Sequence, residues 1–395
     1  MNHSTWKQVT ACIYFICISI LVVAFCSGCT KEVNGKEINY VLESGDTVIK
    51  YTGQLVNGTP EGTCDATIQS GNTLWEYHGT IENSRFANTG TVKDMPYLLC
   101  ATAGDYSGLY TGDVCNGLPD GLGTFRYSAD SSLFTYKGAW KAGEIHGAGQ
   151  LSSNIHVVHF TNGLDREGSY DGEVVDGIPC GNGEFSATNA EGVHYQYNGE
   201  WKDGLFNGQG TMVFDSDEYF NRIGTFTDGE FTPTFTDLFV SLGTGVPKFD
   251  LSVKQISMLN FFHNNDRGDK WKQSELTAFL SKYTYSSLKI SQYKKKPSDF
   301  QNGLIFLGNS RIVQINEYDD LLGYSDVTFR MILANQAGSD IAYAYGIGET
   351  PKMYEGTNIH VWGYPLGTSF YDGVDGQTVP CTVIYVFAIA YADQQ

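Results

Sequence analysis

The stretch Tyr197–Met212, YNGEWKDGLFNGQGTM, carries a spacing of glycines and aromatics that recurs through the first half of the chain. Counted from Tyr197, glycines stand at +2, +7, +11 and +13, and a tryptophan stands at +4. Further copies start at Tyr51, Tyr77, Tyr110, Tyr136 and Tyr170, and a half copy starts at Gly224. A spacing repeated about seven times indicates an array, because a short unit must bury its apolar face against its neighbours.

Each unit has the pattern of a β-hairpin. The aromatic and glycine positions 0, +2 and +4 lie on one face of a strand. Asn-Gly or Asp-Gly at +6 and +7, as in Asp203-Gly204, favours a tight turn with positive φ. Glycine is poor in strands, so we expect these glycines to let the ring of a neighbouring repeat lie flat on the backbone.

This YxGxW…G…GxG pattern closely resembles the MORN repeat family over roughly Tyr51 to Phe231. The resemblance implies a sheet of stacked hairpins. It leaves the role open, because MORN arrays occur as scaffolds, as dimerising spacers and beside catalytic domains.

The N-terminus indicates export. Lys7 precedes an apolar run from Val9 to Phe25, which ends in Cys26-Ser27-Gly28-Cys29. This resembles a bacterial lipoprotein signal, which implies lipidation of Cys29. The alternative is an uncleaved membrane anchor, because about 20 apolar residues can span a bilayer. Both interpretations place the chain on the extracytoplasmic face of the cell membrane, with Thr30 to Glu37 as a tether.

The charge balance excludes some partners. The 395 residues carry a net charge of −19, with a pI near 4.7. Nucleic-acid phosphates require a positive surface, so nucleic acid is not expected as a partner. Nonspecific adhesion to anionic lipid is disfavoured for the same reason.

Five cysteines follow Cys29: Cys64, Cys100, Cys115, Cys180 and Cys381. The odd number leaves at least one unpaired within a monomer. Export permits disulfides. The one pairing we consider is Cys100 with Cys115.

Past Phe231 the glycine spacing stops, which marks a domain boundary. Helical spacing predicts helices over Leu251–Phe262 and Trp271–Leu280. Five strands are predicted at Gly303–Ile315, Val327–Asn335, Ile341–Gly346, Thr357–Gly363 and Val379–Tyr391. Five strands in about 100 residues favour a small barrel or sandwich.

The order of features from Tyr285 to Tyr391 resembles the small OB-fold domains of exported bacterial lipoproteins. The resemblance implies a short helix before the first strand and a closing hairpin formed by the last two strands. The predicted fold class is mainly β: a MORN-type antiparallel hairpin sheet, a small helical connector and an OB-like barrel. The predicted parts are a signal or anchor in 1–28, a tether and first strand in 29–50, the array in 51–231, a linker with short helices in 232–284 and the OB-like domain in 285–395.

Metal chemistry has little support in the sequence. Asn264, Asp266 and Glu275 fall at positions 1, 3 and 12 of a calcium loop, but the glycine wanted at position 6 stands one residue early. His156 and His159 are three residues apart and point to opposite faces of a strand. We therefore predict a solvated helix connector rather than a calcium site, and no metal or other cofactor.

Two surfaces are candidates for binding. The first is an aromatic groove on the array, formed by Tyr110, Tyr136, Trp140, Tyr170, Tyr197 and Trp201. The second is the face of the OB-like barrel that bears Phe329, Arg330 and Tyr343. In both cases the same residues could instead serve only to pack the core. For the array we favour core packing over a binding groove.

No nucleophile with a base emerges from the sequence motifs. The sequence therefore predicts a non-catalytic, membrane-anchored binding or scaffold protein of the bacterial cell envelope, whose partner is another envelope protein. The alternatives are a module that binds cell-wall glycan, and an enzyme with its site between the array and the barrel.

Overall fold

The structure is a computed structural model that describes residues 29–101, 104–127, 133–285, 290–350, 353–372 and 378–392. The apolar run Val9–Phe25, expected to be a signal or anchor, lies outside these residues. Within the described ranges, no helix combines the length and the apolar character needed to cross a bilayer.

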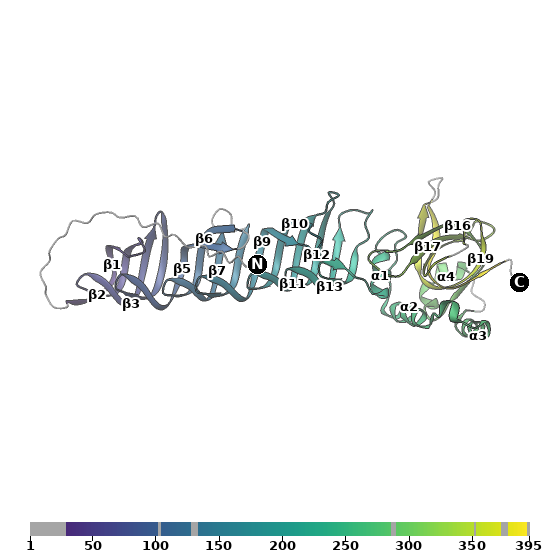
Figure 1. Cartoon of the computed structure of the whole chain (residues 1–395), viewed down its shortest axis with the longest axis horizontal. Coiled ribbons are helices and arrows are strands. Elements are labelled where there is room, and N and C mark those ends of the chain that lie inside the picture. The colour runs from purple at the N-terminus through teal and green to yellow at the C-terminus, as the bar shows by residue number, and fades with distance from the viewer. Residues whose placement is uncertain are drawn as a thin grey trace, which may run out of the picture. The chain divides into compact units, whose positions relative to one another are not determined.

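The first part of the chain is a 15-stranded antiparallel sheet in which hydrogen-bonded neighbours follow chain order (Figure 1). Its strands are β1 Thr30–Val41, β2 Thr47–Val56, β3 Thr59–Ser70, β4 Thr73–Glu82, β5 Arg85–Ala101, β6 Gly104–Cys115, β7 Leu118–Tyr127, β8 Phe134–Lys141, β9 Glu144–His159, β10 Asp165–Val175, β11 Ile178–Thr188, β12 His194–Lys202, β13 Leu205–Phe214, β14 Arg222–Thr227 and β15 Glu230–Phe231. Two compact units share the chain: one holds the described residues up to Val92 with Cys115–Gly117, and the other holds the rest.

The hairpin turns form as predicted. The residue at +6 and the glycine at +7 both have positive φ, for example Asp203 at 51° and Gly204 at 82°. In the repeat that starts at Tyr77, Ser84 replaces the turn glycine, and both turn residues still have positive φ: Asn83 at 50° and Ser84 at 65°. These are the dihedral signs of a type I′ turn, whose twist matches that of the flanking strands.

Each tyrosine at position 0 lies on glycines of its own hairpin. Gly199 and Gly210 face each other across β12 and β13; a Cβ on Gly210 would clash with the Tyr197 ring, and one on Gly199 would clash with the Tyr197 hydroxyl and the Gly210 backbone. The prediction that a neighbouring repeat's ring covers these glycines is therefore wrong. The ring stays within its repeat because the Tyr197 hydroxyl donates to the carbonyl of Glu200, three residues on, at 2.7 Å.

The same tyrosine hydrogen bond recurs in every copy that starts with tyrosine. The O–O distance is 2.6–3.0 Å for Tyr51 to Gln54, Tyr77 to Thr80, Tyr110 to Asp113, Tyr136 to Ala139 and Tyr170 to Glu173. The copies that start at Tyr51 and Tyr77, in which Cys64, Ser84 and Asn88 replace glycines, thus keep the hydrogen bond of the repeat.

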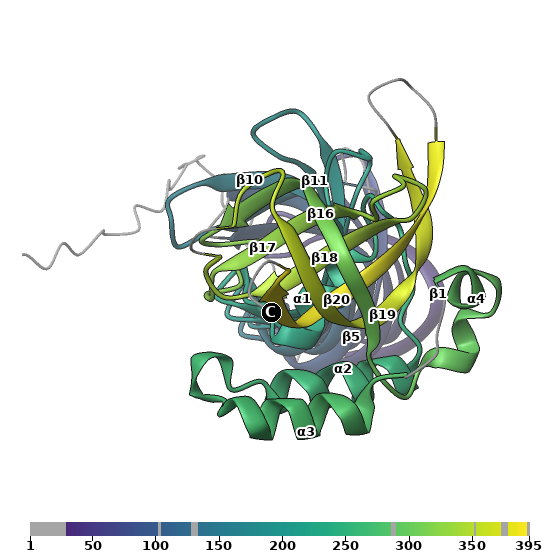
Figure 2. The ribbon, with the colours of Figure 1, turned by 90° about the vertical axis from the view of Figure 1, so that its right-hand side faces the viewer.

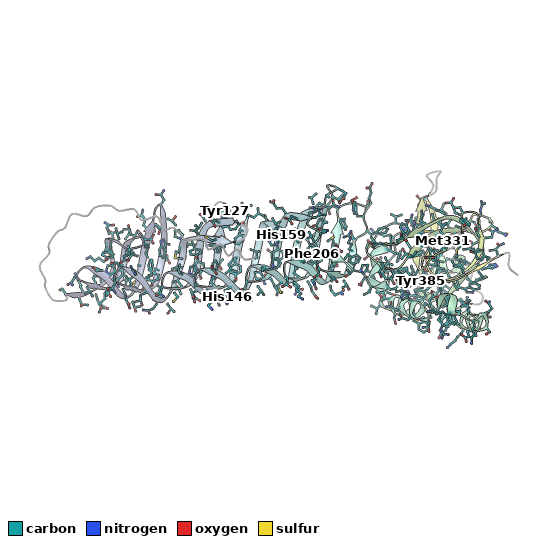
Figure 3. The ribbon with its side chains drawn as sticks, in the orientation of Figure 1. Tyr127, His146, His159, Phe206, Met331 and Tyr385 are labelled. Carbon is teal, nitrogen blue, oxygen red and sulfur yellow. The ribbon has the colours of Figure 1, made fainter. Side chains whose placement is uncertain are left out.

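Tryptophans and turns link one repeat to the next. Trp201 Nε1 donates to the carbonyl of Gly183 in the preceding copy at 3.1 Å, and its ring lies edge-on to Tyr170 at 5.0 Å. The turn glycine Gly204 donates its N–H to the carbonyl of Pro179, also in the preceding copy. Phe206, which is labelled in Figure 3, stacks on Tyr197 with ring centroids 4.0 Å apart.

The first strand replaces the expected tether. Lys31 and Lys36 of β1 pair with Leu55 and Tyr51 of β2 and lie on the core face, whereas Glu32 and Glu37 lie on the other face. Thr30 to Glu37 is therefore part of the sheet. If β1 of a second copy of the chain paired antiparallel with this edge, lysines would meet lysines on one face and glutamates would meet glutamates on the other. A bulge after Val33 also interrupts β1. Both features protect a sheet edge.

The described cysteines are free: Cys29, Cys64, Cys100, Cys115, Cys180 and Cys381. The predicted Cys100–Cys115 pairing is wrong because Cys100 lies next to the β5–β6 connection and Cys115 ends β6. About ten strand residues at ~3.3 Å each separate the two ends of such a hairpin. Burial raises the pKa of the Cys64 thiol to about 11, which makes it unreactive at neutral pH.

A helix that we did not predict closes the other edge of the sheet. Helix α1, Phe235–Leu242, begins at a capping box in which Thr234 and Asp237 exchange hydrogen bonds. Asp237, Ser241 and Thr244 accept from alternate backbone N–H groups of the β14 edge, at Thr225, Ile223 and Asn221. Strand β15 pairs only with Phe226 and Thr227, and these three side chains cap the residues before them.

The C-terminal part is a closed five-stranded barrel with the strand order β16-β17-β18-β20-β19, in which only β18 and β20 are parallel. Its elements are β16 Ile305–Tyr318, β17 Thr328–Ala334, β18 Ile341–Ile347, β19 Asn358–Asp372 and β20 Thr378–Tyr391. The helical elements before it, after α1, are α2 Val253–Asn265, η1 Gly268–Lys270, α3 Gln273–Tyr283, α4 Ile290–Lys295 and η2 Pro297–Phe300. The predicted fold class is confirmed, and β19 extends nine residues beyond its predicted end.

Two apolar layers meet at the barrel wall. Met331 belongs to the barrel interior, whereas Tyr345 and Tyr385 point outward from β18 and β20 and are buried beneath the helices. Figure 2 shows α2 and α3 side by side along one side of the barrel, and Figure 3 marks Met331 and Tyr385. The helices thus cover part of the outer barrel face.

His156 belongs to the aromatic layer of the array. Its ring centroid lies 5.1 Å from that of Tyr170 and 6.4 Å from that of Phe185. Burial, with a smaller contribution from His159, lowers the pKa of His156 to about 4. The folded protein therefore holds this imidazole neutral under mildly acidic conditions.

Changing Gly210 to alanine is expected to destabilise the array by about 1–3 kcal/mol, because the new Cβ would lie 2.5 Å from the Tyr197 ring. Urea unfolding followed by fluorescence measures the shift in midpoint. Gly163→Ala is the control: it lies in an open turn at φ +77° and adds only backbone strain of about 1 kcal/mol.

Double variants identify the repeat that supplies the ring. Gly210→Ala is expected to be non-additive with Tyr197→Leu and additive with Tyr170→Leu. Equal coupling to both tyrosines would contradict the assignment of each ring to its own hairpin.

Stability is expected to increase with pH between about 4 and 6.5. In that window the unfolded state, with the ordinary pKa of 6.5, binds a proton that the folded state does not. The slope from His156 is at most about 1.4 kcal/mol per pH unit. His156→Phe should remove this component of the urea-unfolding profile, and His159→Gln should retain it; a slope unchanged by His156→Phe would exclude His156 as its source.

Candidate functional site

The predicted aromatic groove on the array does not exist as a surface. The exposed fractions of the six residues are 0% for Tyr110, Tyr136 and Tyr197, 1% for Tyr170, and 3% for Trp140 and Trp201. Their rings pack on glycines and on one another, which leaves no ring face for a ligand. These residues stabilise the array.

The predicted barrel face is also largely closed. Phe329 points into the barrel interior, and Tyr343 is buried among residues of the helical layer. The Arg330 guanidinium lies over the rings of Tyr318 and Tyr343, at 5.9 and 5.6 Å. Of the three candidates only Arg330 keeps partial exposure.

The opposite face of the array carries an open channel that we did not predict. It has a volume of about 840 Å³ and crosses strands β6 to β11. Gly123, Gly138 and Gly149 form its floor, with Gly123 paired to Gly138 and Gly138 to Gly149. Because strands lie about 4.8 Å apart, the channel is about 24 Å long.

The two walls of the channel differ in chemistry. Thr124, Lys137, Gln150 and Glu173 are consecutive cross-strand partners and form a polar wall. The other wall is aliphatic: Leu122 lies opposite Ala139, and Ala148 lies opposite Val175. Leu122 is 69% exposed and Val175 is 45% exposed.

Acidic side chains at position +3 shape the backbone beside the channel. A bulge follows position +2 in the copies that start at Tyr170 and Tyr197, and in the copies of Tyr110 and Tyr170 the carboxylate at +3 accepts from the N–H at +12. Asp113 accepts from Leu122 N at 2.9 Å, and Glu173 accepts from Asn182 N at 2.7 Å. Part of the negative charge of the chain is therefore structural.

Ser186, His194 and Asp215 form a hydrogen-bonded line that resembles a catalytic triad. Ser186 Oγ lies 2.7 Å from His194 Nε2, and His194 Nδ1 lies 2.7 Å from Asp215 Oδ2. Ser186, however, pairs with strands on both sides, so the ladder occupies its backbone N–H, which cannot then form an oxyanion hole. The His194 and Asp215 side chains are 49% and 68% exposed. We interpret this line as a cross-strand polar cluster.

Histidine–aspartate pairs recur elsewhere in the array without a serine. The pairs are His78 with Asp65 at 2.5 Å, His146 with Asp176 at 3.2 Å and His159 with Asp165 at 3.1 Å. Their recurrence supports a structural role for the pair that includes His194. Because His159 faces Asp165 while His156 packs on Tyr170, the two histidines do not share a ligand.

The residues of the calcium-like loop have protein partners. Asp266 Oδ1 accepts from Gly268 N at 2.9 Å, and burial raises the pKa of Asp266. Glu275 pairs with Arg267 at 3.3 Å and with Lys272 at 3.8 Å. No cluster of three or more histidine, cysteine or acidic side chains suited to a metal occurs in the described ranges.

Sequence comparison identifies the repeat. The comparison with curated proteins finds no match. The family model of the MORN repeat matches residues 110–131, 136–154, 170–189 and 197–218. These ranges include the residues that line the channel and the tyrosines that lie on glycines. The segment from residue 110 to residue 218 is thus built of MORN repeats.

Proposed function

We propose that this chain is a membrane-anchored, extracytoplasmic scaffold protein of the bacterial cell envelope, which holds an extended segment of a partner protein in the channel of its MORN array. The observation that carries the proposal is the channel itself. The six tyrosine and tryptophan rings of the repeats are buried, so the face that bears them has no groove. The opposite face carries the open channel. A surface built in this way binds without a reaction centre.

The chemistry of the channel favours an extended polypeptide. A strand-like segment places alternate side chains on opposite sides, so its polar residues can face Lys137 and Gln150 while its apolar residues face Leu122 and Val175. A channel of about 24 Å accommodates about seven extended residues at ~3.3 Å each.

The position of Cys29 supports the proposed anchor. Cys29 is exposed and stands directly before β1. Its carbonyl accepts from Asn57 N at 3.2 Å, and its own N–H donates to Asn57 Oδ1 at 3.3 Å. A lipid on the Cys29 sulfur would therefore hold the first hairpin close to the membrane surface, without a flexible spacer.

We assign the barrel to the OB type. Its strands run in the order first, second, third, fifth and fourth, and the last two strands form the closing hairpin. A short helix, α4, precedes the first strand. Because the helices cover Tyr343 and Tyr345 on β18, this barrel does not present the second and third strands as an OB fold does for an oligonucleotide.

The channel is tested by crosslinking on intact cells. A photoreactive residue at Lys137 is expected to form an adduct with a protein, and Leu122→Glu with Val175→Glu should reduce its yield at least 10-fold by placing charge on the apolar wall. A photoreactive residue at Lys202, which is exposed on β12 outside the channel, serves as the control.

Two results would contradict a channel that binds protein. One is an adduct that resists protease but is released by a wall-digesting enzyme, which would favour the alternative of a glycan partner. The other is an equal yield of the same adduct from Lys137 and Lys202.

The anchor is tested separately. Cys29→Ala is expected to abolish incorporation of a labelled fatty-acid precursor, because the thiol is the attachment point in the proposed lipoprotein. Cys100→Ala is the control, since Cys100 is a second exposed thiol. Unchanged labelling of the Cys29 variant would rule out lipidation there.

A further inference from the structure

One end of the barrel encloses a small hollow of about 100 Å³. Leu307, Leu333 and Ala342, from three different strands, form its apolar wall, and all three belong to the barrel interior. A water molecule occupies about 30 Å³ in the liquid, so the hollow has room for about three groups of that size. Ligands commonly bind at the mouths of β-barrels.

The hollow contains a buried hydroxyl without a partner. Thr382 continues the inward-facing row of Ile384 and Val386 on β20, and it is 1% exposed. Its Oγ1 makes no hydrogen bond with the described residues. Leaving such a group unpaired costs about 1–3 kcal/mol, so its presence requires an explanation. Ser310, 5% exposed, lines the same hollow with a second hydroxyl.

An aromatic ring stands at the opening of the hollow. Phe306 lines it and is 42% exposed, and its ring is held 4.9 Å from Trp362 and 5.7 Å from His360. His360 Nδ1 accepts from Asn309 N at 2.9 Å, so a neutral imidazole carries its proton on Nε2. That N–H is a donor beside the Phe306 ring.

The hollow favours a neutral ligand. Its one carboxylate, Asp340, already has partners: Lys294 Nζ lies 3.1 Å from Oδ1, and Asn335 Nδ2 lies 3.2 Å from Oδ2. The ion pair cancels the charge at the opening. What remains is a pair of hydroxyls, which both donate and accept, beneath an exposed ring.

We propose that this end of the barrel binds a neutral sugar residue. The apolar face of the sugar ring lies on Phe306, and its exocyclic hydroxymethyl group enters the hollow and hydrogen-bonds to Thr382 and Ser310. This arrangement satisfies the buried Thr382 hydroxyl and fits the volume. The site is separate from the channel and from the anchor, so a negative result for sugar binding would leave the proposed scaffold function unaffected.

The test uses the full chain, purified in mild detergent, and measures binding of glucose and galactose by saturation-transfer NMR. One stacked ring and two hydrogen bonds predict a Kd in the millimolar range. The matched probes are 6-deoxyglucose and 6-deoxygalactose, which lack only the hydroxyl that would enter the hollow. They are expected to bind at least 10-fold more weakly.

Two pairs of variants separate the site from the fold. Thr382→Val is expected to abolish sugar binding while the thermal midpoint stays the same or increases, because an unpaired hydroxyl is removed. Thr328→Val is its control: Thr328 is also buried, at 2%, with an unpaired Oγ1, but lies outside the hollow. Phe306→Ala should weaken binding about 10-fold, whereas Phe370→Ala, which removes a ring that is 62% exposed elsewhere on β19, should retain it.

Three results would overturn the proposal. These are failure of both hexoses to bind at concentrations up to 100 mM, equal binding of the hexoses and their 6-deoxy analogues, and binding by Thr382→Val equal to that of the unchanged chain. Each would show that the hollow holds only water.

Discussion

The structure depends on one contact, a tyrosine ring lying on two glycines of its own hairpin while its hydroxyl bonds to the carbonyl three residues on. In the repeat that starts at Tyr197 the glycines are Gly199 and Gly210, and the carbonyl is that of Glu200. The contact removes a bulky side chain from solvent without a second sheet, because the glycine backbone itself supplies the surface that the ring covers. Successive repeats need only the tryptophan and turn hydrogen bonds to join into one layer.

The contact between tyrosine and glycine determines which face of the array can bind a partner. The face with the rings is filled by its own side chains, so the aromatics that suggest a binding groove are unavailable. On the other face, the backbone of Gly123, Gly138 and Gly149 lies between the polar row with Lys137 and the aliphatic row with Leu122. The strands that carry the tyrosine layer on one face thus form the channel floor on the other, and the acids at +3, such as Asp113 and Glu173, account for part of the charge of −19.

The array and the C-terminal part of the chain differ in how their buried polar groups are hydrogen-bonded. The array's core tyrosines direct their hydroxyls to backbone carbonyls, and two side chains of α1, together with Thr244, accept from N–H groups along the edge at β14. The buried polar atoms without partners among the described residues all lie from His263 onward, in the helices and the barrel. Most of them are covered by protein, but Thr382 lines a hollow with an exposed ring at its opening, and this makes the barrel end a site for a small polar group.

The sequence by itself determined the repeat, its turns and the strand content of the barrel. Those features follow from local rules: the alternation of side chains along a strand, the positive φ of Asp203-Gly204, and the apolar alternation of Val379–Tyr391. The capping box Thr234–Asp237 is also local, and it is the signal in the sequence for the start of α1. Only the tertiary structure decided which repeat each ring covers, that helices bury Tyr343, and that Leu122, Lys137 and Thr382 line open space. These depend on which strands and helices meet across long stretches of chain, and residue spacing in one sequence carries no information about that.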